Sequence, residues 1–281
     1  MLIFIIFTSK LPLEQRYFIE LSFKGTAYHG WQVQPNAPSV QQAIEEALSI
    51  LLKEKVRLTG AGRTDTGVHA SYFVAHFTST SELLNLPGET MRKLNHMLSN
   101  DIAILSIFPV KENYHSRFNA VSRTYKYYIS RRKNPFRQET SYHISADLDT
   151  AAMNRAAEEL LNYSDFSSFC RTNTNVRTHI CKIIHAGWHE EQEMLVFTIK
   201  ADRFLRNMVR AIVGTMLEAG YGKLPVDGFR KIIESKDRRR AGTSAPPQGL
   251  FLTEIEYPPE IFSQKTGNGK GPESLTRIKG S

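Results

Sequence analysis

The sequence predicts an α/β or α+β fold with a mixed, largely antiparallel sheet flanked by helices. Segments in which apolar and polar residues alternate, as in half-buried strands, are interleaved with segments of helical periodicity. Neighbouring strand segments lie close enough in sequence to form hairpins. With 281 residues, 41% of them hydrophobic, the chain is long enough for one large domain or two of ordinary size.

The first half begins with an alternating strand that ends at Gly25. The next segment predicts a helix over 40–54, with Ser39 as its N-cap and Gln42 three residues later as a capping-box partner. The remaining elements expected in this half are strands at 56–62, 71–77 and 102–108 and a helix at 89–98.

The second half shows a similar alternation without any short-period repeat. A pair of strands near 182–190 and 193–201 is expected to form a hairpin. The other expected elements are strands at 123–131 and 249–257 and helices at 149–162, 204–220 and 226–235. We therefore expect two related subdomains, at 16–115 and 116–258.

The two ends of the chain differ in composition from the middle. The start of the chain, MLIFIIF, is apolar but too short to span a bilayer, and it lacks the basic start and cleavage site of a signal peptide. It is expected to be a buried strand or part of a loosely attached leader, and residues 1–15 are assigned to this leader. Residues 259–281 are rich in Gly, Pro, Ser and Lys, which predicts a disordered tail. With only two cysteines, the chain is expected in a reducing compartment, as a cytoplasmic protein that does not enter a membrane.

The charge of the chain points to an anionic partner. The formal net charge is +8 and the sequence pI is about 9.4. A strongly basic balance favours binding to nucleic acid or to another anionic surface, although it says nothing about the fold.

The segment Gly60–Ala70, GAGRTDTGVHA, carries the most distinctive pattern. It is not a phosphate-binding loop, because Val68 stands where that motif needs lysine, and a dinucleotide fingerprint fails because Asp65 stands where the third glycine should be. The triplet DTG also occurs in aspartic proteases, which need two carboxylates that share a proton and hence a dimer here. Arg63 argues against that alternative, because a guanidinium favours the ionised carboxylate.

The remaining interpretation is a single ionised aspartate that acts as a nucleophile or as an electrostatic partner. In an extended segment Arg63 and Asp65 would share a face, since residues two apart point the same way. The structural alternative is an Asp–Arg pair that braces a tight turn. Later in the chain, Arg206 and Arg210 stand four residues apart beside an apolar helix, and Asp65 is a candidate partner for them.

A basic and aromatic segment lies at 121–137. It contains no acid, and tyrosines and Phe136 alternate with basic side chains, a composition suited to gripping RNA through phosphates and stacked bases. The alternative is a strand with a solvated basic edge. The six basic residues of this segment are Arg123, Lys126, Arg131, Arg132, Lys133 and Arg137, and the first four are the candidate RNA contacts.

A metal site is not expected. The candidate ligands Cys170, His179, Cys181 and His185 have spacings that fit no ordinary zinc pattern.

Five segments together resemble the tRNA pseudouridine synthase A family, in the family's order, between Tyr17 and about Pro258. The loop segment is long enough to be specific, and the leader and the tail lie outside the resemblance. The five segments are YHGWQ at 28–32, GAGRTDTGVHA at 60–70, NAVSRTYKYYI at 119–129, FLRNMVRAIVG at 204–214 and AGTSAPPQGLFL at 241–252.

The resemblance implies a role for particular residues. It matches Asp65 to the family's catalytic nucleophile, Tyr125 to the tyrosine that lies against the target uracil, and Arg210 to the arginine that pairs with the catalytic carboxylate. It matches Arg63 to the loop arginine that helps to hold the flipped-out nucleotide. The implied fold is two related subdomains with a central cleft.

The resemblance also implies a homodimer that isomerises uridines of the tRNA anticodon stem-loop without a cofactor. The isomerisation only rearranges atoms, so it calls for neither a redox cofactor nor a metal. Two other hypotheses stay open at this point: an RNA-binding protein that does no catalysis, and a dimeric aspartic protease.

Overall fold

The computed structural model describes residues 14–172, 177–263 and 265. Most of the expected leader and most of the expected tail lie outside these residues. Within them, one nine-stranded sheet has the order β4-β1-β3-β9-β5-β8-β7, with β2 beside β3 and β6 beside β5. No helix in the described part of the chain is both long enough and apolar enough to cross a membrane.

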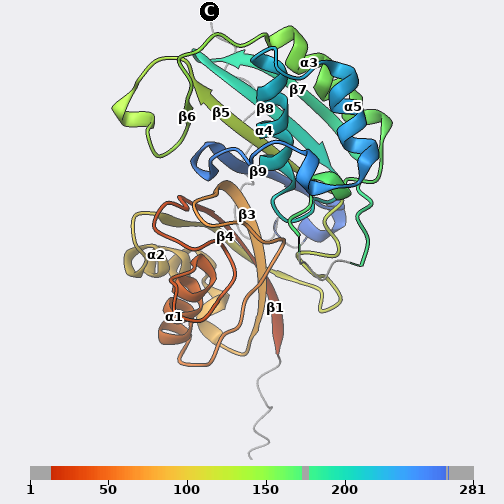
Figure 1. The fold of residues 1–281 in the computed structure, drawn as a ribbon. Coiled ribbons are helices and arrows are strands. Elements are labelled where there is room, and N and C mark those ends of the chain that lie inside the picture. Colours follow the sequence, from red (N-terminus) through yellow and green to blue (C-terminus); the bar gives the residue numbers. More distant parts are fainter. Residues whose placement is uncertain (1–13, 173–176, 264, 266–281) are drawn as a thin grey trace, which may run out of the picture.

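The first half supplies the antiparallel strands at one end of the sheet, with two helices beside them (Figure 1). The segment expected as a strand at 56–62 forms only a two-residue strand. A cluster of buried apolar side chains such as Phe18, Ile44 and Leu94 fills the space between these helices and the sheet. The elements are β1 (Gln15–Phe23), α1 (Val40–Leu52), β2 (Thr59–Gly60), β3 (His69–Ser79), α2 (Pro87–Met97) and β4 (Ile102–Val110).

The second half supplies the other end of the sheet and three helices, which lie across the strands and to their right in Figure 1. The expected hairpin forms from β7 and β8. A second apolar cluster, with Phe169, Phe197 and Ile212, lies between the helices and the strands. The elements are β5 (Ser122–Ser130), β6 (Tyr142–His143), α3 (Thr150–Glu159), β7 (Ile183–Glu191), β8 (Met194–Ala201), α4 (Met208–Gly220), α5 (Val226–Ser235) and β9 (Leu250–Glu256).

Short 3₁₀ turns complete the element order. They are η1 (Glu82–Asn85), η2 (Pro135–Arg137), η3 (Leu160–Asn162), η4 (Ser167–Phe169), η5 (Arg238–Arg240), η6 (Pro247–Gly249) and η7 (Pro259–Phe262).

The last strand joins the two halves. β9 pairs in parallel with β3 at two positions only, His69 with Phe251 and Ala70 with Leu252. On its other side β9 pairs antiparallel with β5. The halves therefore share one continuous sheet, and the seam between β3 and β9 begins where the loop that carries Asp65 ends.

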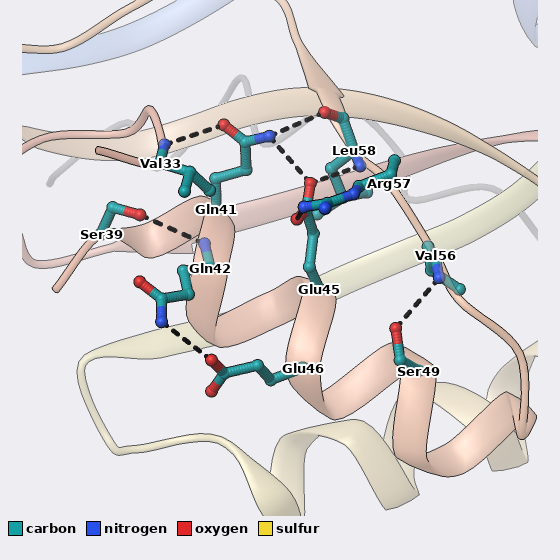
Figure 2. A network of polar contacts seen from close by, with 10 residues as sticks. All are labelled: Val33, Ser39, Gln41, Gln42, Glu45, Glu46, Ser49, Val56, Arg57 and Leu58. Atoms are coloured by element: carbon teal, nitrogen blue, oxygen red, sulfur yellow. Dashed lines mark hydrogen bonds and ion pairs between the residues drawn. The ribbon is translucent and has the colours of Figure 1, made fainter. Parts of the chain in front are cut away.

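The helix α1 begins as the sequence predicts, but its polar contacts differ from a capping box (Figure 2). Ser39 caps the helix by accepting a hydrogen bond from Gln42 N at 3.3 Å. The Gln42 side chain does not return to Ser39, because its amide donates to Glu46 Oε1 at 2.9 Å. The reciprocal half of the expected capping box is therefore wrong.

The buried carboxylate of Glu45 links α1 to the segment that leads into β2 (Figure 2). Glu45 is 5% exposed, and its Oε1 accepts hydrogen bonds from Leu58 N at 2.8 Å and from the Gln41 amide at 2.8 Å. Its other oxygen lies 3.0 Å from Arg57 Nη1. A buried carboxylate needs such partners, since an unpaired one is costly to bury.

The helix expected at 204–220 starts later than predicted. Asn207 has a φ of 65°, in the left-handed region, and its amide donates to Ser244 Oγ at 2.6 Å. This turn separates residues 204–206 from α4, which begins at Met208. Arg206 and Arg210 consequently do not lie on one helical face, although both approach Asp65 as described below.

The first residues of the tail that was expected to be disordered are folded. Residues 259–262 form η7, and Ile261 is 1% exposed within the first apolar cluster. Lys265 Nζ lies 2.7 Å from the buried carboxylate of Glu20 on β1. An apolar side chain and an ion pair thus hold this short segment against the first half, which the composition of the tail does not reveal.

Candidate active site

The loop between β2 and β3 carries Asp65 and is anchored at both ends. Ala61 N donates to Val74 O at 2.8 Å, and Gly67 N donates to Tyr28 O at 3.3 Å. Val68 N donates to Asp65 O at 3.1 Å, which closes a turn around Gly67 at a φ of 76°. The carboxylate therefore projects from a turn whose backbone is held on both sides.

The segment 28–32 packs against the backbone of this loop. Gly30 has a φ of 89°, and a Cβ at this position would lie only 2.3 Å from Thr64 O. The ring of Trp31, which is 2% exposed, packs 4.2 Å from the ring of Phe73 on β3. A side chain at position 30 would therefore push directly on the backbone next to Asp65.

Two arginines of the second half face the Asp65 carboxylate. Arg210 Nη1 lies 3.3 Å from Oδ2, and Arg206 Nε lies 3.9 Å from Oδ1. The Asp65 side chain is 21% exposed, so it remains partly accessible from outside. The site therefore joins one negative charge from the first half to two positive charges from the second.

The orientation of Arg210 is fixed by the chain before β9. Arg210 Nε donates to Ala245 O at 2.8 Å, and Ala245 N donates back to Arg210 O at 2.9 Å. The next carbonyl, Pro246 O, accepts a hydrogen bond from Tyr127 OH at 2.8 Å. Because Nε is held in this way, the end of the guanidinium is directed toward Asp65.

Tyr125 lies where the two halves meet. Its ring packs against both apolar clusters and lies edge-on to Phe204, with 5.1 Å between the ring centroids. Burial raises the pKa of Tyr125 to about 12, with a lowering contribution from Arg123 and a raising one from Asp65. The phenol therefore keeps its proton at neutral pH and lies within electrostatic reach of the carboxylate.

Arg63 does not brace Asp65 as the turn hypothesis required. Its side chain is exposed, and among the described residues the ion pairs of Asp65 are with Arg206 and Arg210. Arg63 is thus an exposed cation two residues from the carboxylate.

The four residues predicted to bind RNA lie in three different environments. The Arg123 guanidinium is turned into the protein, where it donates to backbone carbonyls. Lys126 points to the opposite side of β5 from Tyr125, since neighbours on a strand alternate, and pairs with Glu191 at 2.7 Å. Arg131 and Arg132 lie just past the end of β5.

Arg131 and Arg132 border a groove of about 430 Å³ between the end of β5 and the β7–β8 hairpin. Phe136, in the same loop, is 94% exposed. Six further groove residues carry polar or charged side chains: Ser130, Lys133, Asn134, Arg137, Glu190 and Glu193.

The described residues contain no group of three or more His, Cys, Asp or Glu side chains placed to hold a metal ion. Cys181 is buried, and burial raises the pKa of its thiol to about 12. It is therefore a protonated thiol inside the second apolar cluster.

Sequence reasoning missed the supports of the site. It assigned no role to the backbone of 243–246, which orients Arg210, or to Gly30, which admits Thr64. Backbone carbonyls leave little trace in a sequence. The signals present were the Pro-Pro pair at 246–247 and the glycine inside YHGWQ.

Comparison with known proteins agrees with the geometry. A family model described as tRNA pseudouridine synthase matches residues 156–258. The chain is 55% identical to the tRNA pseudouridine synthase A of Bacteroides fragilis over 88% of this chain and 98% of that protein. It is 52% identical to the Parabacteroides distasonis protein of that name over the same shares, and 38% identical to that of Bacillus subtilis over 84% and 97%.

Replacing Gly30 tests the support behind the loop. Gly30→Ala should lower the free energy of unfolding by about 1–3 kcal/mol, because its Cβ enters the space of Thr64 O at a strained φ. The matched control is Gly62→Ala in the same loop, where a Cβ meets nothing within 4 Å, and it should change stability by about 0.5 kcal/mol or less. Urea denaturation measures both, and equal stability of the two variants would contradict the proposed support.

Proposed function

Because the chain belongs to the tRNA pseudouridine synthase A family, we propose that Asp65 is the nucleophile with which it isomerises uridine to pseudouridine in tRNA. The observation that supports this role is a single partly exposed carboxylate faced by Arg210 and Arg206. A carboxylate that faces such cations can form and release a covalent bond to a substrate.

The reaction explains why one carboxylate is enough. The bond between the ribose C1′ and uracil N1 breaks, and a bond between C1′ and C5 forms. C5 loses its proton and N1 gains one, so that the product has the atoms of the substrate. The guanidinium groups of Arg206 and Arg210 stabilise the free, negative carboxylate of Asp65. That charge is lost while Asp65 is bonded to the substrate and returns when the bond breaks.

We assign Tyr125 to the target base. Its ring is held at the junction of the two apolar clusters, where an aromatic surface can pack against an extruded uracil. Since burial raises its pKa to about 12, the resting phenol is suited to donate a hydrogen bond and not to remove the C5 proton.

We assign Arg63 to the extruded nucleotide itself. Taking a base out of its stack costs a few kcal/mol, which contacts with the protein must offset. The exposed guanidinium of Arg63, two residues from Asp65, is placed to contact the phosphate or sugar of that nucleotide.

For the body of the tRNA we propose the groove beside Arg131 and Arg132. Cations there can contact phosphates, and Phe136, which is 94% exposed, offers a face on which an unpaired base can stack. Arg123 is less suited to RNA, because its guanidinium donates to carbonyls. Lys126 is paired with Glu191 and Arg131 with the exposed Asp147, so a phosphate would have to replace a carboxylate at either of these two residues.

Other features of the proposal depend on the family resemblance alone. These are the anticodon stem-loop as the target region, a homodimer and a cytoplasmic location. The relation between subdomains 16–115 and 116–258 also rests on the resemblance. Each surrounds most of one apolar cluster, although Leu252 and Ile255 pack in the first cluster and Val68 packs in the second.

Removing the carboxylate is the direct test of the function. Asp65→Ala should abolish pseudouridine formation on an unmodified tRNA transcript, while tRNA affinity stays within about tenfold, roughly 1.4 kcal/mol, because phosphate contacts dominate binding. Asp227→Ala, on the surface of α5, is the control and should leave turnover unchanged. Turnover by Asp65→Ala would exclude its role, and tight binding without product from the unaltered protein would favour a non-catalytic RNA-binding protein.

The groove yields a separate prediction. Arg131→Gln combined with Arg132→Gln should weaken tRNA binding and reduce the slope of log affinity against log salt by about 0.7–0.9 for each lost phosphate contact. Phe136→Ala should weaken binding by about 1–3 kcal/mol without changing that slope, since stacking is not ionic. Lys231→Gln, an exposed cation on α5, serves as the control. An unchanged slope in the double variant would show that the tRNA does not reach the groove.

A further inference from the structure

The guanidinium of Arg123 makes four hydrogen bonds, all to backbone carbonyls. Nη1 donates to Ala120 O at 3.2 Å and to Asp202 O at 2.8 Å. Nη2 donates to Ala61 O at 3.2 Å and to Arg117 O at 2.7 Å. Each of these nitrogens carries two hydrogens, so all four are used inside the protein.

The four acceptors belong to three separate segments of the chain. Ala61 opens the loop that carries Asp65, and its carbonyl lies four residues before the carboxylate. Asp202 begins the connection from β8 to α4, four residues before Arg206. The other two acceptors lie in the chain that leads into β5. One side chain therefore ties the loop of the nucleophile to the connection that carries one of its cations.

The Asp202 end of this contact is itself held. Lys182 N and Arg203 N donate to Asp202 Oδ1 at 2.8 and 2.7 Å. The carbonyl of Asp202 that Arg123 contacts therefore belongs to a residue whose own position is fixed by hydrogen bonds in the second half.

From this geometry we propose that Arg123 is a positioning residue, which sets the loop of Asp65 against the β8–α4 connection and so fixes the carboxylate relative to Arg206 and Arg210. The proposal depends on the function assigned to Asp65. It replaces the RNA contact expected from the basic sequence around Arg123. Burial also lowers the pKa of Arg123, in keeping with a guanidinium enclosed by the protein.

The geometry requires arginine. A planar guanidinium presents its donors in a fixed fork and can reach several acceptors at once, whereas a lysine ammonium is a single point on a flexible stem. A lysine at 123 would keep the positive charge but could not span Ala61 O, Arg117 O and Asp202 O together. Charge and geometry can therefore be separated by substitution.

The experiment compares Arg123→Lys and Arg123→Gln with the unaltered protein on full-length tRNA. Both variants should lower kcat at least about tenfold with KM and the salt slope of tRNA binding unchanged, because the carboxylate is misplaced while the RNA surface is intact. Arg16→Gln is the matched control, since Arg16 also donates to a backbone carbonyl, Tyr114 O at 3.0 Å, but away from the Asp65 loop. It should retain kcat.

Two results would overturn the proposal. The first is full activity of Arg123→Lys, since charge alone would then suffice. The second is a raised KM and a reduced salt slope with kcat unchanged, since Arg123 would then be an RNA contact.

Hydrogen exchange provides a readout that needs no turnover. In Arg123→Lys, amides of the loop between β2 and β3 should exchange at least about tenfold faster, whereas those of the β7–β8 hairpin should be unchanged. Unchanged exchange of the loop amides would contradict the positioning role of Arg123. Loss of protection throughout the chain would show that Arg123 has a general role in stability instead. If the unaltered protein makes no pseudouridine, the proposed function of Asp65 is wrong, but hydrogen exchange still tests whether Arg123 positions the loop.

Discussion

The ion pair between Asp65 and Arg210 is the contact on which the rest of the site depends. It joins a loop of the first half to the first turn of α4 in the second, over 3.3 Å. Neither side chain is placed by its own element alone. The carboxylate is held by a turn packed against Gly30, and the guanidinium is held by the carbonyl of Ala245. The geometry of the pair is therefore a property of how the two halves meet.

The sheet explains why the halves meet in a fixed way. β9 comes from the end of the chain but lies between β3 and β5, so the last strand closes the junction between the two apolar clusters. Tyr125 packs against both clusters, and Val68, at the end of the Asp65 loop, packs in the second. A site at such a seam can take its carboxylate from one half and its cations from the other.

Periodicity in the sequence was sufficient for most helices and strands, and for the Ser39 cap. It failed where tertiary contacts decide, as at Asn207, whose left-handed turn next to Ser244 delays the start of α4. The sequence also did not reveal which partners the basic side chains would contact. Arg123 and Lys126 belong to one basic run, yet one binds carbonyls and the other pairs with Glu191, because strand alternation and distant partners separate them. The composition of the basic run reveals neither the face of the strand on which a side chain lies nor the distant residue that it contacts.

A crystal structure of the protein bound to tRNA would test the role of Asp65 most directly. We expect a uridine turned out of its stack, with its ring against Tyr125, its ribose and base within reach of the Asp65 carboxylate, and the pair with Arg210 intact. A bound tRNA whose nearest uridine stays stacked and remote from Asp65, or an Asp65 turned away from both arginines, would contradict it.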